Sequence, residues 1–180
     1  MNNKGFTLIE VLAVMIILGI VLMISVPNIS QYITRSRRSS YITDAKRYVE
    51  AARSEVESER LKMTSKNTCY YIPRECLPVN KGQQSPFGDW NGLYVVVTYD
   101  GKTHDYYFTS TDTSGIGINL TYADNLTEFK LVKNKASVKT NVCVGNRTNI
   151  KIIGADCGVR TATNKTASIS NNIKERSWKI

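Results

Sequence analysis

The sequence predicts an α+β fold in which one long N-terminal helix packs on a C-terminal antiparallel sheet. Three observations lead to this fold class. Residues Val11 to Thr34 form a run of 24 without a charged side chain. The segment 35–63 then spaces its apolar residues three, four or seven positions apart, as on one face of a helix. Beyond residue 91, β-branched and aromatic stretches alternate with segments rich in Asn, Thr, Gly and Ser, which is typical of strands and turns.

The uncharged run is long enough to cross a membrane. As a helix, its 24 residues would span about 36 Å, against about 30 Å for a bilayer hydrocarbon core. The run ends in Ser25-Val26-Pro27-Asn28, a poor match to the small-residue site at which secretory signal peptides are cleaved. Glu10 lies at its start, and a carboxylate inside a membrane helix needs a partner. Cleavage between Gly5 and Phe6 would create an α-amino group on Phe6 that could pair with Glu10 of a neighbouring chain.

The residues Lys4-Gly5-Phe6-Thr7-Leu8-Ile9-Glu10, followed by this apolar run, resemble the class III signal peptide of type IV prepilins. The resemblance covers about the first third of the chain. It implies that residues 1–5 are a leader, which a prepilin peptidase removes after Gly5 before methylating the amine of Phe6. It also implies that Glu10 and Phe6 act together in subunit assembly.

The same resemblance implies a function. The chain would be a structural subunit of a type IV pilus. It would resemble the type IVa-like major pilins, including those of Gram-positive systems. It would insert in the cytoplasmic membrane with a single span and then polymerise into an extracellular filament used for adhesion, twitching motility or biofilm formation. Its partners would be further copies of itself, minor pilins, the prepilin peptidase, assembly and retraction ATPases and a membrane platform. Gly19 and Pro27 match positions at which pilin helices bend or melt in the filament, and proline by itself disrupts the preceding helical turn.

Other functions stay open. A minor pilin or a type II secretion pseudopilin shares these features, and a signal-anchored surface protein that binds as a monomer is an alternative from a different class. We expect no enzyme and no cofactor. His104 stands alone and is expected to be an exposed strand residue, and Gly115-Ile116-Gly117 lacks the third glycine and the helix of a phosphate-binding loop.

The positive charge lies outside the N-terminal segment. The 180 residues are 42% hydrophobic and 22% charged, with 24 Lys and Arg against 15 Asp and Glu and a net charge of +9. This composition excludes an intrinsically disordered chain. Because Lys4 and Glu10 cancel, the net charge belongs to the exposed remainder. It suits the binding of DNA or an anionic cell surface, or an ordinary solvated face.

Beyond the leader we expect four segments. A membrane and filament-core half of the helix covers 6–34, and an amphipathic half covers 35–63. A loop over 64–91 joins the helix to a head, 92–180, with an antiparallel sheet of about four or five strands and a hairpin at Asp100-Gly101. Strand-like stretches occur at 93–99, 105–109, 116–122, 128–132, 138–144 and 150–153.

Four cysteines follow the helix. An even number in an exported protein suggests disulfides. We expect the pairs Cys69–Cys76 and Cys143–Cys157, because each would close a local loop and the second resembles the C-terminal disulfide loop of many pilins. Free thiols and a zinc site are alternatives, but the sequence has no CxxC spacing, and we expect no metal.

Overall fold

The computed structural model describes residues 6–79, 84–133, 136–145, 147–154, 157 and 159–161, without the side chains of 26–28 and 159–161. Two compact units make up the chain, Met1–Arg37 and Arg38–Ile180. Helix α1 spans Leu8–Glu57 and contributes its first part to one unit and its second part to the other.

The first part of α1 is apolar on all sides. Its exposed large apolar side chains range from Ile33, 45% exposed, to Leu8, 88% exposed. Among the described residues, α1 is the helix that is long and apolar enough to cross a membrane. A helix without a polar face requires lipid or other protein around it.

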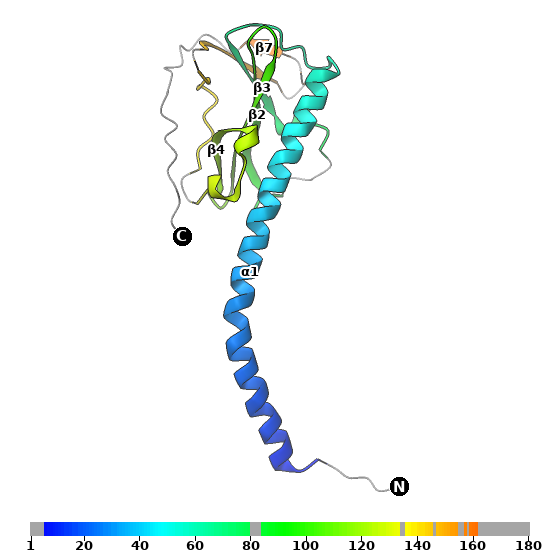
Figure 1. Ribbon diagram of the computed structural model, residues 1–180, viewed down its shortest axis with the longest axis vertical. Helices are drawn as coiled ribbons and strands as arrows, with labels where there is room; N and C mark the ends of the chain where they lie inside the picture. Colours follow the sequence, from blue (N-terminus) through cyan, green and yellow to red (C-terminus); the bar gives the residue numbers. More distant parts are fainter. Residues whose placement is uncertain are drawn as a thin grey trace. The chain divides into compact units, whose positions relative to one another are not determined.

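The second part of α1 is amphipathic and packs on the sheet of its own unit (Figure 1). The apolar stripe predicted from the sequence lies in the core, with Ala45 and Ala52 fully buried. Tyr41 and Tyr48 belong to the same face and both contact the ring of Trp90 edge-on, with centroids 4.9 and 6.2 Å away. The helical period therefore identified the buried face correctly.

Helix α1 ends at Glu57, earlier than the predicted limit at residue 63. The chain turns at Glu59, which has a left-handed φ of 57°, and the Leu61 amide donates to the Glu55 carbonyl at 3.1 Å. Met63 is 1% exposed, so it enters the core from the segment after the helix. Its spacing matched the helical stripe although its backbone is not helical.

The second unit contains a seven-stranded sheet in the order β5-β4-β3-β2-β1-β6-β7. Neighbouring strands are antiparallel, except that β1 and β6 are parallel. The strands are β1 (Thr68–Pro73), β2 (Trp90–Tyr99), β3 (His104–Asp112), β4 (Gly117–Tyr122), β5 (Leu131–Val132), β6 (Asn149–Ile153) and β7 (Val159–Thr161). Short 3-10 turns are η1 (Arg74–Cys76), η2 (Ala123–Asn125) and η3 (Glu128–Lys130). The predicted α+β class is confirmed, with more strands than expected.

Strand β1 lies in the segment that the sequence predicted to be a loop. All six of its residues are buried, so it shows no alternation of polar and apolar residues. The nearby Pro73 and Pro78 pointed to a loop instead. The β2–β3 hairpin is where the sequence placed it, with Gly101 at a φ of 108° in the turn.

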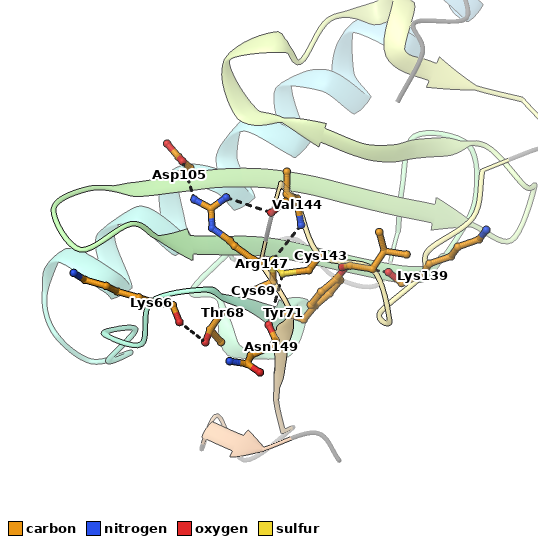
Figure 2. Close-up of a disulfide and its surroundings, with 11 residues drawn as sticks. Lys66, Thr68, Cys69, Tyr71, Asp105, Lys139, Cys143, Val144, Arg147 and Asn149 are labelled. Carbon is orange, nitrogen blue, oxygen red and sulfur yellow. Dashed lines mark hydrogen bonds and ion pairs between the residues drawn. A yellow bond between two sulfur atoms is a disulfide. The ribbon is translucent and has the colours of Figure 1, made fainter. Parts of the chain in front are cut away.

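The face of the sheet opposite α1 has its own small core. Cys69, Tyr71 and Val96 are fully buried there, together with Cys143. They are covered by residues 136–145 and 147, here called the strap, which lie between β5 and β6 in the chain (Figure 2).

Side chains of the sheet hold the strap in place. The Tyr71 hydroxyl contacts the carbonyl oxygens of Lys139, at 3.0 Å, and Val142, and the Val144 amide donates to Cys69 Sγ at 3.2 Å (Figure 2). The sequence predicted a strand at 138–144, but this segment crosses the face of the sheet instead of pairing at its edge. Tyrosine and cysteine side chains take the place of a strand neighbour as partners for its backbone.

The predicted cysteine pairing is wrong. The disulfides join Cys69 to Cys143 and Cys76 to Cys157, with Cα–Cα distances of 5.6 and 5.3 Å, and leave none of the four cysteines free. Cys69 lies in β1 and Cys76 at the end of η1, and the four extended steps from Cys69 to Pro73 alone span about 13 Å, beyond the reach of a disulfide. Because β1 and β6 run parallel, each disulfide instead joins one end of the pair. Because all four cysteines form disulfides, the zinc-site and free-thiol alternatives are also wrong.

Candidate functional site

The start of α1 is held by a reciprocal pair of hydrogen bonds between Thr7 and Glu10. The backbone amide and the hydroxyl of Thr7 both donate to Glu10 Oε2, each at 2.8 Å, and the Glu10 amide donates to Thr7 Oγ1 at 3.4 Å. The Val11 amide donates to the Thr7 carbonyl at 3.3 Å. This arrangement is a capping box, which satisfies amides that have no partner inside the helix.

The capping box gives Glu10 a partner within its own chain. The partner expected from the sequence lay on a neighbouring chain, whereas in the structure Thr7 of the same chain binds Glu10. The sequence contains the signal for this capping box, since Thr-x-x-Glu before an apolar run is a known helix start. The box uses only atoms of Thr7 and Glu10, so it would persist after cleavage before Phe6. It fixes the Glu10 carboxylate at the helix N-terminus, four residues from Phe6.

The other predicted assembly residues lie along the same helix or before it. Phe6 is 86% exposed, whereas Gly5 lies outside the described residues, and so does its bond to Phe6. Helix α1 runs through both Gly19 and Pro27 in the single chain. A Cβ built on Gly19 would have no other described atom within 4 Å, so this position is open to a neighbouring helix. Bending at Gly19 and Pro27 in a filament stays a prediction.

His104 is half-buried rather than exposed. Its Nε2 atom lies 3.0 Å from the Met63 carbonyl oxygen, and its ring stacks on Tyr99 at a centroid distance of 4.7 Å. The side chain therefore connects the segment after α1 to the β2–β3 hairpin.

The apolar surface of the first unit is the largest chemical feature of the molecule. Exposed apolar side chains follow one another around the helix from Leu8 to Ile24, and Ile29 and Ile33 continue them. Soluble monomers rarely expose contiguous apolar patches of this extent. The capped carboxylate lies at the end of this surface, so the site consists of one fixed negative charge followed by an all-round apolar helix.

The start of this segment matches a known sequence motif. Residues 1–26 match the family model described as the prokaryotic N-terminal methylation motif. Together with the relative described next, the motif confirms the predicted resemblance of the N-terminal segment to type IV prepilins.

One relative can be named. Over 32 residues the chain is 53% identical to the ComG operon protein 3 homolog of Bacillus licheniformis. The match covers 18% of this chain and 33% of that protein, so it spans about a third of the relative's length. No solved structure matches the chain significantly.

Proposed function

We propose that the chain is a structural subunit of a type IV pilus, and a major one. The observation that carries this proposal is the all-round exposed apolar surface of α1, which the methylation motif, at residues 1–26, overlaps. Lipid would surround this surface while the chain spans the cytoplasmic membrane. In a filament, copies of the same helix would replace the lipid, which is possible because apolar helices can pack on one another as well as on lipid.

The proposed assembly begins with processing. A prepilin peptidase cuts the Gly5–Phe6 bond and methylates the new Phe6 amine. The Glu10 carboxylate then pairs with the Phe6 amine of the adjacent subunit. The capping box supports this step, because Thr7 already orients the carboxylate, which then loses little side-chain freedom on pairing. ATPases and a membrane platform supply the work of extension and retraction.

The head would form the outside of the filament. We propose that it has no enzymatic activity and no cofactor, and that the filament serves adhesion, twitching motility or biofilm formation. The net charge of +9, repeated along a fibre, supports DNA or an anionic cell surface as a ligand.

Substitutions at two positions separate the charge of Glu10 from its capping role. Glu10→Gln keeps an oxygen that can accept from the Thr7 amide but removes the charge. Thr7→Ala removes the hydroxyl of the capping box and keeps the charge. We expect Glu10→Ala and Glu10→Gln to abolish filaments in electron micrographs of shed surface material, and Thr7→Ala to retain them at reduced yield. Immunoblots of membranes control for expression.

A signal-anchored monomer predicts a different result. Its amount at the cell surface would be the same for the wild type and for all three variants, and no shed filament would contain the chain. That outcome would overturn the proposed function.

A further inference from the structure

The second unit carries a groove of about 600 Å³ beside the exposed side of α1. Its apolar lining comes from Ala51 on the helix and from Pro78 and Val79 after η1. Lys46, Arg47 and Glu50 supply charged groups along the helix. Arg47 pairs with Asp44 at 3.6 Å and Glu50 with Arg53 at 3.9 Å, so the groove offers a partner an apolar surface with Lys46 beside it.

The same unit exposes one bulky apolar side chain far more than any other described there. Phe129 in η3 is 76% exposed, whereas Tyr122, the next such residue, is 37% exposed. Glu128 precedes Phe129 and Lys130 follows it. The turn thus presents an acid and an aromatic ring, which complement Lys46 and the apolar lining of the groove.

The two features lie in different parts of the sheet. Turn η3 leads directly into β5 at one edge, whereas Pro78 and Val79 follow β1 and η1, and three strands separate β1 from β5. Phe129 therefore cannot enter the groove of its own chain. A contact between Phe129 of one copy and the groove of the next joins two different surfaces, and such contacts repeat without closing unless the rotation between copies forms a ring.

We propose that Phe129 docks in the groove lined by Ala51, Pro78 and Val79 of an adjacent copy, with Glu128 facing Lys46. This inference rests on the proposed pilus function and adds a head-to-head contact to it. The N-terminal helices hold copies together by their apolar surfaces, and the Phe129 contact sets how neighbouring heads meet.

Cross-linking in assembled filaments tests the contact. The double variant Thr127→Cys/Thr43→Cys keeps Phe129 and places one thiol at an exposed position beside it and one at an exposed position of the groove. A short bis-maleimide reagent should produce a ladder of dimers, trimers and longer multimers on denaturing gels. Each single variant should stay monomeric. The matched control, Thr127→Cys/Lys62→Cys, has its second thiol at an exposed position outside the groove and should give no ladder.

A charge exchange tests the same contact without new cysteines. Glu128→Lys should lower the temperature at which filaments dissociate, and adding Lys46→Glu should restore it. Lys62→Glu serves as the matched control and should not rescue. No ladder from the Thr127→Cys/Thr43→Cys variant, or equal dissociation temperatures for all charge variants, would overturn the inference. In either case wild-type filaments still form, whereas failure of the proposed function would leave no filaments to test.

Discussion

Asp112 is a buried carboxylate that joins two loops. It is 2% exposed, and its Oδ1 atom accepts hydrogen bonds from the amides of Ser114 and Ile116 at 2.9 Å each. Its Oδ2 atom accepts from the Ser85 hydroxyl at 2.9 Å. The β3–β4 turn and the segment before β2 are therefore organised by one side chain.

Asp112→Ala should lower the free energy of unfolding by about 3 kcal/mol, because buried donors without an acceptor cost roughly 1–3 kcal/mol each. Asp112→Asn should cost less, since its amide oxygen still accepts one or both amides. Urea denaturation of the full chain in detergent, followed by circular dichroism, measures the change. Asp124→Ala, at an exposed position in η2, is the control, and an equal loss there would contradict this role of Asp112.

Asp100 organises the turn of the β2–β3 hairpin, and its carboxylate is fully exposed. Its Oδ1 atom accepts from the amides of Lys102 and Thr103 at 2.7 Å each. These hydrogen bonds, from Thr103 first and then Lys102, lower the pKa of Asp100 to about 2.

Because the pKa of Asp100 is lower in the folded state, its carboxylate stabilises the hairpin at any pH above the ordinary Asp pKa. This stabilisation is lost as the pH falls towards the folded-state pKa. We therefore expect the Asp100 carboxyl carbon to titrate with a midpoint near pH 2 in NMR spectra of the full chain in detergent. Over the same pH range, the backbone amides of Lys102 and Thr103 should exchange faster relative to the intrinsic exchange rate at each pH. A midpoint at the ordinary value of 3.8 would show that the two amides do not bind the carboxylate.

The strap depends on its contacts with β1. Tyr71 is fully buried, and burial raises its pKa to about 12, partly offset by the hydrogen bond to the Val142 carbonyl. The hydroxyl donor is therefore neutral at physiological pH and available to the strap carbonyls.

Tyr71→Phe keeps the ring and removes the hydroxyl. We expect faster hydrogen exchange in the strap and a loss of about 1–2 kcal/mol in the free energy of unfolding, since two carbonyls lose a donor. Tyr94→Phe is the matched control, because the Tyr94 ring packs edge-on against Tyr71 at 5.8 Å. If exchange in the strap is the same in both variants, the hydroxyl does not hold it.

At the scale of the whole molecule, two disulfides connect the early and late parts of the second unit. The paired cysteines are 74 and 81 residues apart. In the chain-entropy model, closing loops of this length contributes about 4 kcal/mol each. The pairing therefore ties the parallel β1–β6 pair, the least local pairing in the sheet, to the rest of the fold.

A tryptic map without reduction tests this pairing directly, because cleavage after Lys and Arg places each cysteine in its own peptide. Peptide 67–74 should be joined to 140–147, and peptide 75–81 to 152–160. In protein from shed filaments, the N-terminal peptide of the chain should begin at N-methylated Phe6. A link between 67–74 and 75–81 would restore the nearest-neighbour pairing predicted from the sequence.

Local patterns predicted the parts of the fold that depend on nearby residues. The uncharged run, the helical stripe and the β2–β3 hairpin each follow from spacing within a few turns or one strand. The prediction failed at β1 and at the strap. A strand buried on both faces shows no alternation, and a segment that crosses a sheet has the same composition as a strand within it.

The sequence by itself determined the N-terminal chemistry of this protein. The motif around Gly5, Phe6 and Glu10 and the apolar helix after it consist of contiguous residues, so they can be read without a fold. Tertiary structure alone decided which cysteines pair and where Phe129 and the groove lie. Those relations depend on the parallel β1–β6 neighbours and on the strand order, which join residues more than seventy positions apart. Contacts at that separation depend on how the strands pack together and have no local signature in the chain.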